Sequence, residues 1–113
     1  MLHLDTHQPV FRALADPTRR AILKLLSKAP LRVNDIAEHF EMTRPAVAKH
    51  LDILEHAQLI ATEKKGRERL NHLTPAPLAQ AADWLSFFDH FWDQRLADLK
   101  TAVETSYDRD ENR

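Results

Sequence analysis

The sequence contains no cysteine and a single glycine among its 113 residues. Without cysteine, the chain has no disulfide framework, no thiol nucleophile and no thiolate metal site. The lone Gly66 excludes the glycine-rich loops that cradle phosphates in P-loop and dinucleotide-binding proteins. No apolar run approaches the ~18 residues of a membrane span, and the first residues lack the basic and apolar regions of a secretory signal. We therefore expect a cytoplasmic protein.

The charged residues are unevenly distributed along the chain. Hydrophobic residues make up 43% and charged residues 29% of the sequence, which is typical of one packed domain, and the net charge is −1. Residues 9–75 carry twelve Lys and Arg against eight Asp and Glu, whereas residues 76–113 carry four against eight. The positive excess over residues 9–75 favours a polyanionic partner for that part of the chain.

The order of local signals predicts a mainly α chain with a small β-hairpin. Asp16 before Pro17 is a strong helix start, because the Asp side chain caps free N–H groups and proline has none to satisfy. Gly66 lies in a charged segment between two short apolar runs, where the tip of a hairpin requires a positive φ. The expected elements are helices at residues 10–14, 17–29, 33–40 and 44–56, strands at 59–62 and 70–73, and one long helix at 78–105.

These elements imply one folded domain with disordered ends. We expect residues 1–8 and 106–113 to be disordered, since the first segment lacks periodicity and the last is highly charged. Residues 9–75 would form a winged helix-turn-helix unit. Residues 76–105 would form a C-terminal dimerisation helix of the same domain.

The second helix of the helix-turn-helix carries the sharpest functional signal. Its apolar positions turn one face inward, so the other face and the N-terminal end are free to enter a DNA major groove. There, arginine reads guanine edges and small apolar groups contact thymine methyl groups. Taken singly, each cation could equally be an ordinary solvated charge. The predicted DNA contacts on this helix are Thr43, Arg44, Pro45, Ala46, Lys49 and His50.

The predicted hairpin adds a second basic element. Four cations surround Gly66 at its tip, as in wings that lie on the DNA backbone or enter the minor groove. The alternative is an exposed hairpin kept soluble by its charge. The predicted DNA contacts on the hairpin are Lys65, Arg67 and Arg69, with Arg67 as the anchor.

Two further arginines allow two interpretations. Arg19 and Arg20 follow the helix start at Asp16. They could contact DNA phosphates, or they could form ion pairs that tie their helix to a neighbour. The sequence leaves both open.

Three segments together resemble the ArsR/SmtB family of winged-helix repressors. They are FRALADPTRRAILKLL, DIAEHFEMTRPAVAKHLDILEHAQLI and EKKGRERLNHLTP, in this order over about residues 9–105. The resemblance, closest to metal-independent members, implies an αααα-ββ-α winged helix-turn-helix, a homodimer paired through the first and last helices, and repression at an inverted-repeat operator, often the gene's own promoter. Two positions depart from the pattern: Arg32 stands where the family often has a Ser or Thr cap, and Ala48 where many relatives have serine.

The long last helix is the expected dimerisation element. Its large apolar residues recur every three or four positions, and no later chain segment remains to cover them. The predicted dimer interface comprises Val10, Phe11, Leu14, Leu85, Phe88, Trp92, Leu96, Leu99 and Val103.

Other functions fit the sequence less well than DNA binding. The seven histidines are scattered and zinc needs converging ligands, so we expect no metal or other cofactor. Neighbouring acid–base pairs such as Glu38 and His39 diverge around a helix, so we expect no enzyme. Two alternatives stay open: a repressor that senses a small apolar ligand among the aromatic residues, and a protein–protein interaction module that uses the aromatic C-terminal helix.

Overall fold

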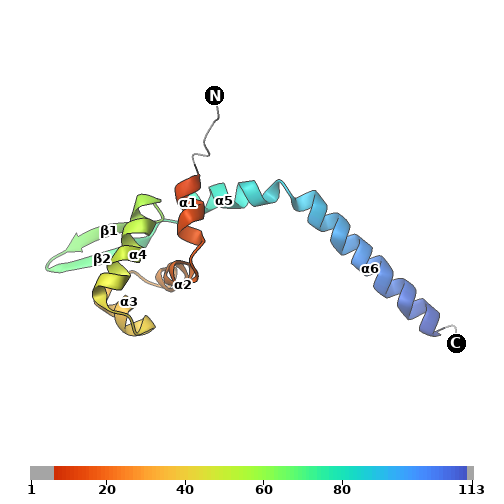
Figure 1. Ribbon diagram of the computed structural model, residues 1–113, viewed down its shortest axis with the longest axis horizontal. Coiled ribbons are helices and arrows are strands. Elements are labelled where there is room, and N and C mark those ends of the chain that lie inside the picture. Colours follow the sequence, from red (N-terminus) through yellow and green to blue (C-terminus); the bar gives the residue numbers. More distant parts are fainter. Residues whose placement is uncertain (1–6, 112–113) are drawn as a thin grey trace, which may run out of the picture. The chain divides into compact units, whose positions relative to one another are not determined.

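The computed structural model describes the backbone of residues 7–111 and the side chains of residues 7–106. The chain divides into two compact units, and the boundary falls within a helix, after Ala81. In chain order (Figure 1) the elements are α1 (Gln8–Leu14), α2 (Pro17–Leu26), α3 (Val33–Phe40), α4 (Arg44–His56), β1 (Ile60–Lys65), β2 (Glu68–Leu73), α5 (Ala76–Ser86) and α6 (Asp89–Glu111). The predicted disorder of residues 1–6 lies outside the described residues, whereas Gln8 is already helical.

The start of α2 is the predicted one. Asp16 Oδ1 accepts hydrogen bonds from the backbone N–H groups of Thr18 (2.7 Å) and Arg19 (3.2 Å). The helix ends at Leu26, earlier than the stop expected at Pro30, and the hydroxyl of Ser27 donates to the carbonyl oxygen of Lys24 at 2.6 Å. A hydroxyl that bonds back to the chain competes with helix propagation, which explains the shorter helix.

A tight turn joins α3 to α4 and creates the predicted helix-turn-helix. Glu41 adopts a left-handed conformation with φ of 53°, and the N–H of Met42 donates to the carbonyl oxygen of Ala37 at 2.9 Å. Thr43 then caps α4, because its Oγ1 accepts from the N–H of Ala46 at 3.3 Å. This left-handed helix end redirects the chain and sets the angle between the two helices.

The β-hairpin extends further than the sequence predicts. Its strands pair in antiparallel fashion from Ile60 opposite Leu73 to Lys65 opposite Glu68. Gly66 begins the two-residue turn with φ of 65°, as expected for a tip that requires a positive φ. The outer pairs of the hairpin consist mainly of charged side chains and show no alternation of apolar and polar residues. The sequence therefore did not predict the ends of the strands near the turn.

The hairpin is joined to the segment between α2 and α3 by a short bridge. Leu31 and Asn71 exchange backbone hydrogen bonds of 3.1 and 2.8 Å, and the Asn71 side-chain amide donates to the Leu31 carbonyl oxygen at 3.1 Å. Asn71 is only 2% exposed and is the buried polar residue of the described core. The bridge therefore holds the base of the hairpin against the helical part of the first unit.

One hydrophobic core holds the first unit together. The inner face of α4 is fully buried in it, with Val47 and Leu54 at 0% exposure, so the opposite face of α4 is turned to solvent. The buried core residues are Val10, Ala13, Ile22, Leu23, Leu26, Ile36, Ala37, Val47, Leu51, Leu54, Ala57, Leu59, Ile60 and Ala81.

The second unit corrects two expectations. The predicted single helix over 78–105 is broken at Phe87 and Phe88, whose N–H groups bond to the carbonyl oxygens three residues back, and α6 begins anew at Asp89. The chain is then helical to Glu111, so the prediction of a disordered 106–113 is wrong for residues 106–111. Once a helix is nucleated, each added residue costs little, so high charge alone does not end it. No described helix is long and apolar enough to cross a membrane.

Candidate nucleic-acid interface

The N-terminal half of α4 presents the predicted contact residues on the surface of the first unit. Thr43, Arg44, Pro45 and Lys49 are exposed, and Ala46 is half-buried beside the cap. Because the inner face of α4 is locked into the core, these side chains cannot turn inward without disrupting it. The helix thus offers a cationic, small-residue surface at an N-terminus, where the helix dipole also favours anions.

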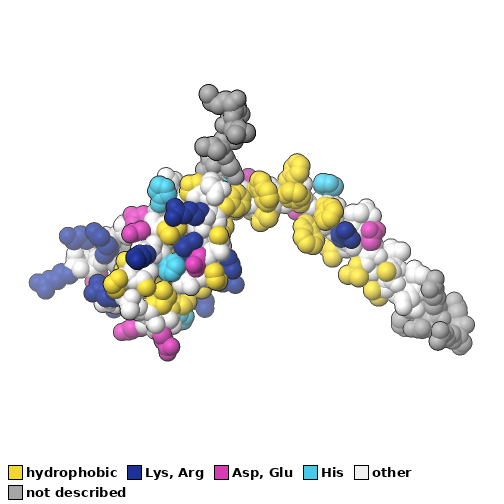
Figure 2. Space-filling view, in the orientation of Figure 1, with side chains coloured by type: hydrophobic (Ala, Val, Ile, Leu, Met, Phe, Trp, Pro, Cys, Tyr) yellow, Lys and Arg dark blue, Asp and Glu magenta, His cyan; other side chains and the backbone are white. Residues whose placement is uncertain are grey.

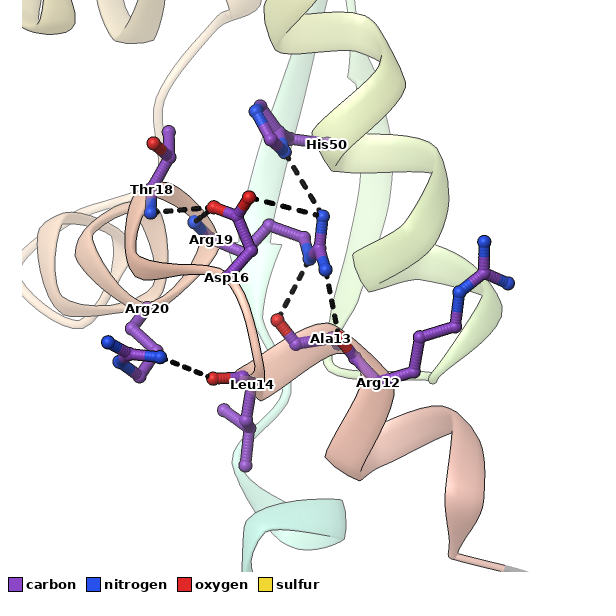
Figure 3. A network of polar contacts seen from close by, with 8 residues as sticks. All are labelled: Arg12, Ala13, Leu14, Asp16, Thr18, Arg19, Arg20 and His50. Carbon is purple, nitrogen blue, oxygen red and sulfur yellow. Dashed lines mark hydrogen bonds and ion pairs between the residues drawn. The ribbon is translucent and has the colours of Figure 1, made fainter.

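His50 lies differently from the other predicted contacts. It is half-buried, and its Nδ1 is 3.4 Å from Nη1 of Arg19 on α2 (Figure 3). Arginine is always a donor, so a hydrogen bond between the two side chains requires this ring nitrogen to be the acceptor. His50 is therefore anchored to α2 through one edge and has only its other edge to offer elsewhere.

Arg19 is a structural arginine that connects the first helices to α4. Its Nε donates to the carbonyl oxygen of Ala13 (2.9 Å) and its Nη2 to that of Arg12 (2.8 Å), both at the C-terminal end of α1. Its side chain is 11% exposed, and Nη1 also lies 3.8 Å from the Asp16 carboxylate. Of the two interpretations left open by the sequence, the tie between helices is the one observed (Figure 3).

Arg20 also links α2 to the end of α1, through a single hydrogen bond. Its Nη1 donates to the carbonyl oxygen of Leu14 at 2.7 Å, while the residue stays exposed. Arg19 and Arg20 together donate to carbonyl oxygens of the last turn of α1, where the helix itself supplies few N–H donors.

Asp16 is held ionised within the same network. Partial desolvation raises its pKa, but the N–H groups of Arg19 and Thr18 and the nearby Arg19 guanidinium outweigh that effect, so the pKa of Asp16 lies below its usual value. The N-cap of α2 is therefore a carboxylate at neutral pH. Its negative charge faces the guanidinium that holds α1 and His50.

The hairpin carries cations along both strands. Figure 2 shows Lys and Arg side chains gathered over this part of the molecule. Lys64 faces Arg69 across the ladder, and Lys65 faces Glu68, so only one of these two pairs is neutralised. Lys65, Arg67 and Arg69 are all exposed at or near the tip, as predicted for a wing.

Arg32 is a residue of this surface that the sequence analysis did not include. Its Nε lies 3.2 Å from Asp35 Oδ2 and its Nη1 3.1 Å from Glu68 Oε1, so it connects the start of α3 to the hairpin. The hydrogen bond from Arg32 lowers the pKa of Asp35, and the same bond raises the pKa of Arg32. Asp35 also accepts from the Arg32 backbone N–H at 3.2 Å, whereas Arg32 supplies no side-chain cap of the kind that a Ser or Thr gives at this position. The presence of Arg32 in place of the usual Ser or Thr was the sequence feature that could have pointed to this residue.

The predicted dimer residues fall into two groups. Val10 is 4% exposed within the core of its own unit, so its assignment to an interface is corrected: it has almost no surface left for a partner. Phe11 and Leu14 are partly buried against the same core. The remaining predicted residues are exposed, from 38% to 62%: Leu85, Phe88, Trp92, Leu96, Leu99 and Val103.

Possible metal ligands do not gather in the described part of the chain. No three His, Asp or Glu side chains among the described residues lie close enough to share a metal ion. His72 Nε2 instead contacts Glu63 Oε2 at 2.7 Å across the hairpin.

Comparison with known proteins agrees with the geometry of this surface. The profile of the family described as "Bacterial regulatory protein, arsR family" matches residues 16–62. The chain is 38% identical over 87 residues to the transcriptional repressor SdpR of Bacillus subtilis, which covers 77% of this chain and 97% of that protein. The chain belongs to the ArsR family. It is therefore a transcriptional regulator, and the expectation that it is not an enzyme is confirmed.

Other ArsR-family relatives extend the match. The HTH-type transcriptional regulator Rv2034 of Mycobacterium tuberculosis is 36% identical over 98 residues, or 87% of this chain and 89% of the relative. An ArsR-like transcriptional regulator from Rhodococcus sp. RHA1 superposes with a TM-score of 0.70 at 36% identity, over 87% of this chain and 90% of that structure. These matches confirm the winged helix-turn-helix fold of this ArsR-family chain.

Proposed function

We propose that this ArsR-family chain is a sequence-specific repressor that acts in the cytoplasm as a homodimer on an inverted-repeat operator. The observation that carries the proposal is the solvent-exposed N-terminal half of α4, in the same packed unit as the basic hairpin. In helix-turn-helix dimers, two such helices enter successive major grooves about 34 Å apart. A dimer bound across a promoter would exclude RNA polymerase by occupying its site. That a relative is named a repressor supports repression over activation.

The residues divide into base-reading and backbone-positioning roles. Arg44 is placed to read a guanine edge, while Pro45 and Ala46 offer apolar contact to thymine methyl groups. Lys49 and the hairpin cations Lys65, Arg67 and Arg69 position the chain on phosphates. Thr43 serves mainly by capping α4, and His50 offers only its Nε2 edge, since Arg19 occupies Nδ1.

Dimerisation would use the exposed apolar residues of the second unit. Trp92, Leu96 and Leu99 are each 61–62% exposed along α6. A stripe of this size is costly in water and is typical of an interface. Phe11 and Leu14 retain partial exposure on α1 and could add to it.

The DNA-binding proposal is tested by fluorescence anisotropy with duplex DNA from upstream of the chain's own gene, at two salt concentrations, beside a scrambled duplex. We expect tight, salt-sensitive binding that favours the upstream duplex. Arg44→Ala combined with Lys49→Ala should weaken binding by about a hundredfold or more. Lys24→Ala, which removes an exposed cation from α2, is the control and should change little. Unchanged affinity in the double variant would refute the assignment of α4.

A protein–protein module remains the second candidate, because the aromatic residues Trp84, Phe87 and Phe91 are also 51–73% exposed. Specific capture of a partner by a chain that binds no duplex would favour it. A thermal-shift screen with apolar metabolites addresses the third candidate, a ligand-sensing repressor: a ligand that raises Tm and releases DNA would establish it.

A further inference from the structure

A hollow of about 420 Å³ lies where the starts of α3 and α4 meet the hairpin. Its polar lining comes from Arg32, the N-cap of α3, from Asn34 of α3, from Arg44 of α4, and from Arg67, Glu68 and Arg69 of the hairpin. Four guanidinium groups line the hollow with the carboxylate of Glu68, and Asp35 pairs with Arg32 beside it, which leaves a surplus of two positive charges. Charges of one sign are gathered in this way where a polyanion is to be bound, because their mutual repulsion otherwise destabilises the fold.

The chemistry of the lining fits the phosphate groups of a DNA backbone. Guanidinium groups present planar pairs of N–H donors that match two phosphate oxygens, and Asn34 adds an amide donor. No aromatic ring lines the hollow, so it offers no platform for stacking a nucleobase. The hollow therefore suits a phosphate group of the DNA backbone and makes no contact that depends on the attached nucleobase.

Arg32 is the one guanidinium of the four with acidic partners on two different elements. It is shared between Asp35 within α3 and Glu68 on the hairpin, at 3.2 and 3.1 Å. Asp35 has a second bond to the Arg32 backbone and so stays with its helix. Glu68 is exposed and makes no second side-chain hydrogen bond within the described part of the chain, so its bond to Arg32 is the one that an incoming anion can replace.

We propose that this hollow is a phosphate-binding subsite for the DNA backbone, and that the bound phosphate replaces Glu68 as the partner of Arg32. The inference rests on the proposed DNA-binding function and adds Arg32 and Asn34 to it. One phosphate would then contact α3, α4 and the hairpin together. The subsite would fix the hairpin relative to the recognition helix without reading sequence.

The charge variants give opposite expectations. Arg32→Gln should weaken binding about tenfold, equally for upstream and scrambled duplexes, and reduce the slope of log K against log salt by about 1. Glu68→Gln removes the competing carboxylate and should tighten binding by about three- to tenfold. Glu55→Gln, at the other end of α4, removes the same charge outside the hollow and should change little. Weaker binding by Glu68→Gln would overturn the proposal.

The phosphate itself is identified by chemical replacement. Duplexes are prepared with single backbone phosphates replaced in turn by neutral methylphosphonates. One replacement should weaken wild-type binding about tenfold and have no further effect on Arg32→Gln, because both changes remove the same contact. If the losses of binding free energy from Arg32→Gln and from the methylphosphonate were additive at every phosphate, the hollow would not bind a backbone phosphate. Circular dichroism and the Tm of each variant verify that it is folded.

A free anion is the other source of the same chemistry. Titration with inorganic phosphate, followed by NMR of the Arg32 side-chain N–H and the Asn34 amide, tests the hollow without DNA. If the wild-type chain binds no duplex, the proposed function fails. Shifts of the Arg32 and Asn34 signals in that case would show that the hollow binds free phosphate and not DNA. If it binds duplex but neither the charge variants nor the methylphosphonates behave as stated, only this inference fails.

Discussion

Arg19 on α2 and His50 on α4 are 31 positions apart and meet with Nη1 3.4 Å from Nδ1. The same guanidinium holds two carbonyl oxygens at the end of α1. One largely buried side chain thus links three helices, and one of them carries the proposed recognition surface. This contact adds a polar link to the apolar packing that holds α4 in the first unit.

Removal of Arg19 should therefore cost more than removal of its neighbour. Arg19→Ala leaves carbonyl oxygens of α1 without their charged donor, and we expect the free energy of unfolding to fall by about 2 kcal/mol. Arg20→Ala, a matched control with one exposed carbonyl contact, should cost under about 1 kcal/mol. Urea denaturation measures both. Equal losses in the two variants would contradict the special role of Arg19.

Acid should destabilise the fold through two aspartates. The pKa of Asp16 and that of Asp35 are both lowered in the folded chain. Their stabilisation is therefore fully present above the unfolded-state pKa of about 4 and is lost as the pH falls through the lower, folded values. Urea unfolding measured at steps from pH 7 to pH 2 should show this loss. Asp16→Asn and Asp35→Asn should each make the decline below pH 4 shallower, and an unchanged decline in both would refute the assignment.

We expect Gly66 to affect stability only through its backbone conformation. A Cβ added there meets no atom within 4 Å, so substitution causes no clash, but φ of 65° is unfavourable for other residues. Gly66→Ala should lower stability by about 1 kcal/mol, and Gly66→Asn by less, since asparagine tolerates this region. Thermal unfolding measures the difference. An alanine variant as stable as wild type would show that the turn can rearrange.

The proposed dimer makes a prediction on α6. Leu96 is 61% exposed, and Leu96→Asp should raise the dimer dissociation constant by about a hundredfold by placing a charge in an apolar interface. Ala97→Asp introduces the same charge about 100° around the helix and serves as the control. Sedimentation equilibrium measures both. Wild-type chain that is monomeric at all concentrations would refute the dimer itself.

The helix starts and the hairpin turn depend on contacts within a few residues, and the sequence predicted them. Asp16 with Pro17 and the cap Thr43 each began the helix that was expected, and Gly66 lies at the hairpin turn. These signals are local because a cap or a positive φ is satisfied within a few residues. The break at Phe87 and Phe88 was missed because an apolar repeat continues across it without a proline or glycine.

The order of the elements as far as β2, the inner face of α4 and the basic character of the hairpin could be predicted from the sequence alone. Each depends on spacing or composition within one segment. Long-range packing was needed to show that Arg19 is a structural tie, that Val10 belongs to the core, and that Arg32 joins Arg44, Arg67 and Arg69 around one hollow. An arginine has the same sequence signature in solvent, in an ion pair or beside a phosphate. Its role is set by which distant residues the fold brings within hydrogen-bond distance.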